Sequence, residues 1–397
     1  MKIEDLALQR DKYKRLNDEE WRWFLQQVEG KERTADKLPT FATIEDWWYP
    51  VRLSCEQCSS ELAAKYKREI LHSPKDGLST MVDLTGGYGV DTYFLSEQFE
   101  HTDYVEQNAE LCRIAEHNFQ LKIKNEKLKI HNCTAEEFLQ TAGQYDLIFL
   151  DPARRDSHGG KVFRLEDCTP NVVELLPTLL AHGKRILIKL SPMLDLTQAV
   201  KELSAFSTQW SVYVVAIKNE VKELLLLSHQ PSEVSRQSIT AIDLDKKEQA
   251  FTFTREEESN SEAVLQCNGL TAERSNSPKD GQEKHMLFLY EPNAAILKAG
   301  AYKLVAERFG LQKLDVNTHL YCSEELVEDF PGRVWRIKDE GMKGERMKDE
   351  RANVLTRNYP LTPEQLKKKL HLRDGGTAFV IGCRVNGKPT LFFAERV

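Results

Sequence analysis

Apolar positions along the chain follow two different spacings. Residues 1–75 are rich in Leu, Glu, Lys and Gln with apolar positions spaced as on one helix face, which predicts an N-terminal helical domain. From residue 76, short β-rich runs are separated mostly by helix-length amphipathic stretches. These runs are STMVDLTGG, TDYVEQN, YDLIFLDP, KRILIKLSP, WSVYVVAI and VKELLLL. Over residues 76–235 they predict an α/β fold, a mostly parallel sheet wrapped in helices.

Two hairpins are expected near the end of this region. Only Lys218, Asn219 and Glu220 separate WSVYVVAI from VKELLLL, which is too short for a helical crossover, so these strands should pair antiparallel. SITAIDL and QAFTFT flank DKKE within residues 237–254 and predict another hairpin. Residues 255–284 are polar, so the region 236–284 is expected to be a hairpin followed by a flexible linker or exposed loop.

A second α+β pattern occupies the C-terminal part. In residues 285–330, MLFLYEP predicts a strand, AAILKAGAYKLVAERFG a helix and THLYCS a strand. In residues 331–397, RVWRI predicts a strand, PEQLKKKL a helix, and TAFVIGCRV and PTLFFAERV two strands. Asn386-Gly387 joins the last two strands and predicts a type I′ hairpin, because both central residues of that turn need positive φ.

Composition narrows the class of protein. A chain of 397 residues exceeds one ordinary domain. Its net charge of -7 argues against a protein that coats nucleic acid with its whole surface, yet residues 331–397 hold 15 basic against 8 acidic residues. No apolar run approaches the ~20 residues of a membrane span. The N-terminus lacks the apolar core of a signal peptide and the cysteines are scattered, which favours a reduced, cytoplasmic protein.

A glycine loop and an acidic residue form the first candidate site. Asp83 to Asp91 read DLTGGYGVD at the junction of a predicted strand and helix, where glycines let the backbone turn tightly and approach a ligand. Glu106 ends the next strand about twenty residues later, where a carboxylate accepts hydrogen bonds from ribose hydroxyls. The alternatives are a simple strand-to-helix turn and a solvated carboxylate.

Two further strand ends carry polar groups. After the third strand, Thr134 and Ala135 either contact an adenine ring or, through Thr134, cap the next helix. The fourth strand ends at Asp151, followed by Pro152, at the edge where open α/β sheets bind ligands.

These segments resemble a known enzyme family. DLTGGYGVD, YVEQN and YDLIFLDPARR are similar to motifs I, II and IV of class I S-adenosylmethionine-dependent methyltransferases. The resemblance implies a Rossmann-like sheet and S-adenosylmethionine as cofactor. The cofactor-binding residues it implies are Asp83, Thr85, Gly86, Gly87, Gly89, Asp91, Glu106, Thr134, Ala135 and Asp151.

The segment Asp151-Pro152-Ala153-Arg154 resembles the (D/N/S)-P-P-(Y/F/W) signature of amino-methylating nucleic-acid enzymes, and more closely the DPPR variant of RNA methyltransferases. The resemblance implies that Asp151 orients an exocyclic amine, with Pro152 and Arg154 as the other catalytic residues. Arg154 replaces the stacking aromatic; a guanidinium plane stacks on a base or clamps a phosphate, or it is a surface charge.

Neighbouring residues restrict the chemistry further. No cysteine follows the fifth strand, which reads ILIKLSPMLD, so covalent uracil-C5 chemistry is disfavoured. His158, Lys161 and Arg164 lie either on a loop that closes over substrate or on an exposed mobile loop. A single Cys55-x-x-Cys58 pair does not indicate a metal site.

The C-terminal segments EPNAAILKAG, FPGRVWRI and ERANVLTRNYPLTPEQLKKKL resemble bacterial methyltransferase-like proteins with a ferredoxin-like segment, here 285–330, and a THUMP-like domain, here 331–397. THUMP-type domains present RNA to a modifying domain, and phosphate contacts position RNA without reading sequence. The implied RNA-contacting residues are Arg155, Arg351, Arg357, Lys367, Lys368, Lys369 and Arg373. Lys367 to Lys369 otherwise form the solvated face of a helix.

The sequence therefore predicts a methyltransferase that modifies an exocyclic amine of a base in structured RNA, tRNA or rRNA, without a metal or a membrane anchor. One alternative is a small-molecule or protein methyltransferase. The other is an RNA-binding module with a degenerate S-adenosylmethionine site. The oligomeric state does not follow from the sequence.

Overall fold

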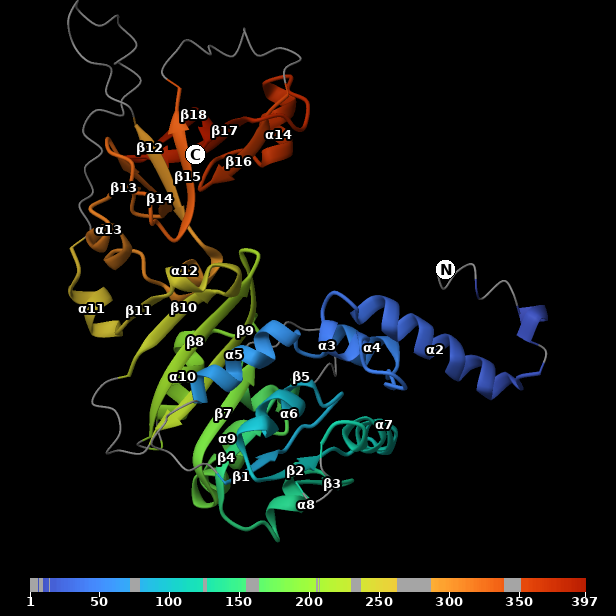
Figure 1. Cartoon of the computed structure of the whole chain (residues 1–397). Helices are drawn as coiled ribbons and strands as arrows, with labels where there is room; N and C mark the ends of the chain where they lie inside the picture. The colour runs from blue at the N-terminus through green and yellow to red at the C-terminus, as the bar shows by residue number, and fades with distance from the viewer. Residues whose placement is uncertain are drawn as a thin grey trace, which may run out of the picture. The chain divides into compact units, whose positions relative to one another are not determined.

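The computed structural model describes residues 6, 10–13, 15–71, 79–123, 127–154, 164–204, 206, 208–229, 237–262, 287–338 and 351–397. The chain divides into two compact units. Unit 1 comprises Met1–Val212 and Glu223–Arg236, and unit 2 comprises Tyr213–Lys222 and Gln237–Val397. Figure 1 shows the elements of both. Among the described residues, no helix combines the length and apolar character that crossing a bilayer requires.

The N-terminal segment is helical, as predicted. It contains η1 (Arg10–Tyr13), α2 (Asp18–Thr34), α3 (Pro39–Ala42), α4 (Arg52–Gln57) and α5 (Glu61–Leu71). These helices share a core with α6 (Val90–Leu95) and α7 (Ala109–Gln120). The buried members of that core are Leu38, Phe41, Trp47, Tyr49, Ala64, Tyr88, Val90, Phe94 and Ile114. The N-terminal helices are therefore packed against the elements that surround the glycine loop.

Seven of the nine strands of the first sheet are β1 (Thr80–Asp83), β2 (His101–Val105), β3 (Leu128–His131), β4 (Tyr145–Leu150), β7 (Gly183–Leu190), β8 (Gln209–Ile217) and β9 (Glu220–His229). Their order is β3-β2-β1-β4-β7-β9-β8. β1, β2, β3, β4 and β7 are parallel, and β9 runs antiparallel to β7. Because the order reverses beside β1, the crevice that binds ligands in such sheets lies at the carboxyl ends of β1 and β4.

The connections of unit 1 are mostly helical. They contain η2 (Ser96–Gln98), α8 (Ala135–Leu139), η3 (Leu165–Asp167), α9 (Val172–His182) and α10 (Leu196–Ser204). β5 (Ala153–Arg154) and β6 (Cys168–Thr169) form a separate two-stranded sheet. β8 and β9 are neighbours joined through Lys218 and Asn219, both at positive φ, which confirms the predicted hairpin.

The start of unit 2 differs in part from the prediction. β10 (Ile239–Asp243) and β11 (Phe251–Phe253) pair antiparallel around η4 (Leu244–Gln249), so the predicted hairpin is confirmed. The prediction of a loop directly after it is wrong for α11 (Arg255–Asn260), because Thr254 and Glu257 form a capping box. The Glu258 carboxylate then accepts hydrogen bonds from the backbone of Tyr302 to Leu304. Residues 263–286 of the predicted linker lie outside the described residues.

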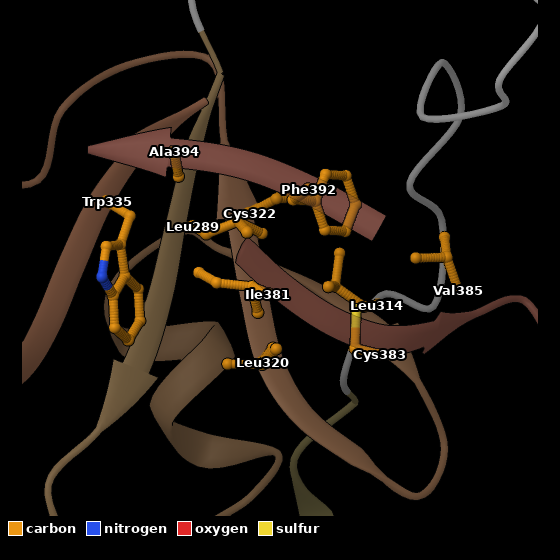
Figure 2. Packing of buried hydrophobic residues seen from close by; sticks show 10 residues of the cluster. All are labelled: Leu289, Leu314, Leu320, Cys322, Trp335, Ile381, Cys383, Val385, Phe392 and Ala394. Carbon is orange, nitrogen blue, oxygen red and sulfur yellow. The ribbon is translucent and has the colours of Figure 1, made fainter. Parts of the chain in front are cut away.

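A seven-stranded sheet forms the rest of unit 2. Its strands are β12 (Phe288–Pro292), β13 (Gln312–Asp315), β14 (Thr318–Ser323), β15 (Gly332–Ile337), β16 (Asn353–Arg357), β17 (Ala378–Val385) and β18 (Lys388–Arg396). Their order is β13-β14-β12-β15-β18-β17-β16. Figure 2 shows that side chains from both C-terminal segments, such as Leu289 and Leu320 from one and Trp335 and Ile381 from the other, pack in one core. The two segments are thus parts of one sheet.

Local turn residues determine where the helices of unit 2 begin and end. The predicted helix from residue 294 is wrong as a single element, because Gly300 at φ +81° ends α12 (Ala294–Ala299) before α13 (Leu304–Arg308) begins. The predicted helix PEQLKKKL is present as α14 (Pro363–Lys369). Asn386 and Gly387 both have positive φ between β17 and β18, which confirms the predicted type I′ geometry.

Candidate cofactor and acceptor site

The glycine loop between β1 and α6 is held tightly against β2. The Gly86 N–H donates to the Val105 carbonyl at 2.8 Å. A Cβ atom on Gly86 would stand 2.1 Å from the Tyr104 ring, and Gly89 adopts φ +81°, a left-handed conformation that favours glycine. The glycines at 86 and 89 are therefore required by a close approach and a backbone conformation respectively.

Glu106 points back over this loop. Its Oε2 accepts a hydrogen bond from the Gly87 N–H at 2.9 Å, and its Oε1 accepts one from the Asn108 N–H at 2.8 Å. The Tyr104 hydroxyl donates to the Gly87 carbonyl at 2.6 Å. Each carboxylate oxygen keeps a lone pair beyond these bonds, so the half-buried Glu106 is able to accept from two vicinal hydroxyls.

Asp83 is the buried acidic residue at the end of β1. It accepts hydrogen bonds from the Thr85 N–H at 3.0 Å and from the Thr92 hydroxyl at 2.5 Å. Burial raises the pKa of Asp83 to about 7, against the hydrogen bonds that favour the carboxylate. The Thr85 hydroxyl in turn accepts from the Asp151 N–H at 2.6 Å, which ties the loop to the end of β4.

The raised pKa of Asp83 predicts a pH-dependent stability. Its ordinary value is 3.8, so between about pH 4 and pH 7 the folded state holds more protons than the unfolded state. The free energy of unfolding should therefore fall as pH rises through that window, by on the order of a few kcal/mol, with the loss complete above pH 7. Asp83→Asn removes this titration and keeps an oxygen acceptor. Urea unfolding of the wild type and Asp83→Asn at pH 5 and pH 8 checks this prediction. An equal change in the free energy of unfolding between the two pH values in both proteins would contradict the assignment.

Asp91 is engaged by the N-terminal helices. Its carboxylate accepts from the Ser59 hydroxyl at 2.6 Å and lies 3.1 Å from the Lys67 ammonium of α5. Lys67 is fully buried and also pairs with Glu223 of β9 at 2.8 Å. Burial favours neutral Asp91, but Lys67 and Lys189 outweigh burial and lower its pKa. Asp91 is 8% exposed, and Ser59 and Lys67, which contact its carboxylate, both belong to the N-terminal segment.

Asp151 forms an ion pair with Lys189 of β7. The Asp151 side chain is 35% exposed and that of Lys189 is 12% exposed. Burial disfavours the charged form of Lys189, but Asp151, Asp91 and Glu223 outweigh it and raise the pKa of Lys189, which stays an ammonium.

Sequence reasoning missed Lys67, Lys189 and Glu223. Charged residues inside or beside apolar strand runs, as in ILIKLS and VKELLLL, were the available signal, since a buried charge needs a partner. Nothing in the sequence named those partners.

The segment after Asp151 is only partly described. Pro152 is buried, and Arg154 pairs through its backbone with Cys168 in β5 and β6. Of the predicted loop residues, Arg164 is exposed and pairs with Glu166 at 2.8 Å. Arg155, His158 and Lys161 lie outside the described residues.

Thr134 acts as a helix cap. The Thr134 hydroxyl accepts a hydrogen bond from the Glu137 N–H at 3.2 Å, and the Thr134 backbone N–H donates one to the Glu137 carboxylate at 2.9 Å. This capping box begins α8, and Ala135 is buried at the first helical position. Of the two alternatives for Thr134, the structure therefore shows the cap; a contact with adenine is not tested by it.

The basic residues of the C-terminal segment differ in their surroundings. Arg357 forms an ion pair with the buried Glu291, and Lys367 forms one with Asp374. The other members of the predicted set, all exposed, are Arg351, Lys368, Lys369 and Arg373. Any phosphate at Arg357 or Lys367 has to compete with a carboxylate.

Metal ligation was not expected at the single Cys-x-x-Cys pair. Burial is the main cause that raises the pKa of Cys55 to about 12, which keeps the thiol protonated. Among the described residues, no group of three or more His, Cys, Asp or Glu side chains gathers in a metal-binding arrangement.

Comparisons with known proteins agree with this architecture. A ferredoxin-like domain model matches residues 288–331, and a THUMP domain-like model matches residues 332–396. The crystal structure of a "putative methyltransferase" from Porphyromonas gingivalis W83 is similar to this chain with a TM-score of 0.78 and 32% sequence identity, covering 96% of this chain and 92% of that chain. A search of the curated proteins finds no match.

Two shorter structures are similar over less than half of the chain. One is a "putative methyltransferase" from Streptococcus mutans in complex with SAH, with a TM-score of 0.32 and 13% identity over 41% of this chain and 95% of that one. The other is an rRNA methylase from Streptococcus thermophilus, with a TM-score of 0.30 and 13% identity over 43% of this chain and 94% of that one. At these scores the similarity carries no conclusion about this chain.

The fold and the glycine-loop edge define a class I methyltransferase architecture. Because a relative 32% identical is matched over nearly its whole length, the chain belongs to the family of that Porphyromonas gingivalis putative methyltransferase, and its C-terminal part matches a ferredoxin-like and a THUMP-like domain. The resemblance noted in the sequence is confirmed.

Proposed function

We propose that this chain binds S-adenosylmethionine at the carboxyl edge of β1, β2 and β4. The acceptor chemistry of the edge fits the cofactor, because the doubly anchored Glu106 carboxylate keeps lone pairs for the two ribose hydroxyls. Asp83 and Asp91 would provide carboxyl oxygens for the ammonium group of the cofactor's amino-acid end. The remaining residues of the proposed site are Thr85, Gly86, Gly87, Gly89, Thr134, Ala135 and Asp151.

We further propose methyl transfer to an exocyclic amine of a nucleobase. The observation that carries this proposal is the position of Asp151, whose N–H donates to Thr85 in the glycine loop and whose carboxylate is paired with Lys189. In this position Asp151 would accept a hydrogen bond from the amine and turn its lone pair toward the methyl group. Pro152 would add its backbone carbonyl, and Arg154 would stack on the base or hold a phosphate.

Methyl transfer to an amine needs little general acid or base catalysis. When bound, S-adenosylmethionine supplies a methyl group on a sulfonium, so the amine lone pair forms the N–C bond while the C–S electron pair stays on sulfur. The residues of this chain contribute by holding the acceptor nitrogen in line at contact distance, which supplies a large share of such a barrier reduction. The extra proton on nitrogen then leaves to water.

RNA is the acceptor class that the C-terminal part favours. Its support is the THUMP domain-like match over residues 332–396 together with the exposed side chains of Lys368 and Lys369 on α14 and of Arg351 and Arg373. We propose phosphate contacts for these four residues, and also for Arg155, Arg357 and Lys367. We place the reaction in the cytoplasm, where thiols such as those of Cys55 and Cys112 stay reduced.

Tritium transfer from methyl-labelled S-adenosylmethionine to total RNA of a strain lacking the gene tests this function. We expect label in one RNA species, recovered after digestion as a nucleoside methylated on an exocyclic amine. Label in small molecules or protein instead would favour the alternative methyltransferases. RNA binding with no S-adenosylmethionine binding would favour the non-catalytic module.

A further inference from the structure

Lys189 is a buried cation at the carboxyl edge to which nothing above assigns a role. It lies on β7 directly after Ile188, which is in register with Leu150 of β4. Lys189 and Asp151 therefore occupy adjacent positions on the two neighbouring strands. An ammonium that is only 12% exposed is costly without an anionic partner, and Asp151 Oδ2 is that partner.

The charges around Lys189 come from several elements. Asp151 stands at the end of β4, Asp83 at the end of β1, Asp91 on α6 and Glu223 on β9, and Lys67 approaches from α5. The electrostatic influence of Asp151, Asp91 and Glu223 reaches Lys189 and favours its charged form. Several carboxylates therefore compete for two buried ammonium groups.

Lys67 contacts two of these carboxylates. Its Nζ lies 3.1 Å from Asp91 Oδ1 and 2.8 Å from Glu223 Oε1, and it donates to the Ser59 hydroxyl at 3.2 Å. Lys67 therefore contacts Asp91 and Glu223 together, and burial raises the pKa of Glu223, which disfavours its charged form. Asp151 is the carboxylate that pairs with Lys189.

We propose that Lys189 is a positioning residue for methyl transfer, held to Asp151 by the charge pairing that Lys67 completes. The inference rests on the proposed function. Pairing through Oδ2 fixes the orientation of the Asp151 carboxylate and lets Oδ1 accept from the acceptor amine. Lys189 itself transfers no proton, because its surroundings hold it as an ammonium.

The same two strands provide a matched control at their opposite end. Lys184 of β7 pairs with Asp146 of β4 at 2.6 Å, five residues before Lys189 and Asp151. Lys184 is 63% exposed, and it lies away from the carboxyl edge. Lys184→Met therefore removes an equivalent lysine–aspartate pair without touching the site.

The test uses the full-length chain and compares Lys189→Met, Lys189→Arg and Lys184→Met with the wild type. Transfer of tritiated methyl to RNA gives kcat, and calorimetry gives the Kd of S-adenosylmethionine. For Lys189→Met we expect a loss of kcat on the order of 100-fold, as for a reacting group displaced by about an ångström, with Kd unchanged. Lys189→Arg keeps a cation beside Asp151 and should recover part of kcat, a rescue that a merely structural role would not give. Lys184→Met should match the wild type.

The outcomes separate this inference from the proposed function. If the wild type labels no RNA, the proposed function fails and the inference fails with it. If the wild type labels RNA and Lys189→Met keeps its kcat, the inference alone is overturned; a parallel loss of cofactor affinity also overturns it. Should Lys189→Met not fold, Lys67→Met is expected to lower kcat, and a wild-type kcat in that variant overturns the inference.

Discussion

Asp151→Ala is expected to retain cofactor binding and to lose methyl transfer by on the order of 100-fold or more. The side chain is partly exposed at the carboxyl edge and is held by Lys189, so we expect it to face the acceptor more than the cofactor. Without it, the amine has no carboxylate to orient its lone pair. Calorimetric titration with S-adenosylmethionine and single-turnover transfer to RNA measure the two effects separately.

Asp151→Asn is the matched control for this variant. It keeps an oxygen acceptor of the same size, and the signature that the segment resembles also admits Asn at this position. We expect Asp151→Asn to retain more transfer than Asp151→Ala, with thermal unfolding close to that of the wild type for both. Turnover of Asp151→Ala at the wild-type rate would remove Asp151 from the acceptor site.

Glu106→Ala is expected to weaken the binding of S-adenosylmethionine by about 100-fold. Two hydrogen bonds from ribose hydroxyls to a carboxylate are lost, each worth roughly 1.5–3 kcal/mol for a charged acceptor. The hydrogen bond that the Gly87 N–H donates to Glu106 is lost as well, so the glycine loop is held less firmly. The measurement is the Kd by calorimetry.

Glu110→Ala serves as the control for Glu106→Ala. Glu110 is an exposed carboxylate in the first turn of α7 and pairs with Arg113 at 2.8 Å on the helix surface. Its removal should leave the Kd within about twofold of the wild type, since surface ion pairs contribute little. Equal affinities of Glu106→Ala and Glu110→Ala for S-adenosylmethionine would show that Glu106 does not bind the cofactor.

The parts of the fold that the sequence predicted are those with local causes. Short β-rich runs predicted the strands of unit 1, and the Asn386-Gly387 pair predicted the last hairpin because both residues need positive φ. The errors also have local causes that compete with the pattern: Gly300 ended a helix that looked continuous, and the Thr254–Glu257 capping box started one where composition suggested a loop.

The missed features depend on contacts between distant residues. The shared core of Leu289 and Trp335 follows from strand pairing across segments, and no periodicity encodes which strands pair. Likewise, Lys67 and Glu223 are 156 residues apart in the chain and meet only in the folded sheet. Single motifs identified the glycine loop, Glu106 and Asp151 as candidates, but the charges that hold Asp91 and Asp151 emerge from the tertiary structure.

Titration of the purified chain with S-adenosylmethionine tests the central claim most directly, because every proposed step depends on the cofactor at the glycine-loop edge. We predict saturable binding of one molecule per chain, which Glu106→Ala weakens and Glu110→Ala leaves unchanged. Absence of binding to the folded wild-type chain would contradict the account and leave a methyltransferase fold without a methyltransferase site.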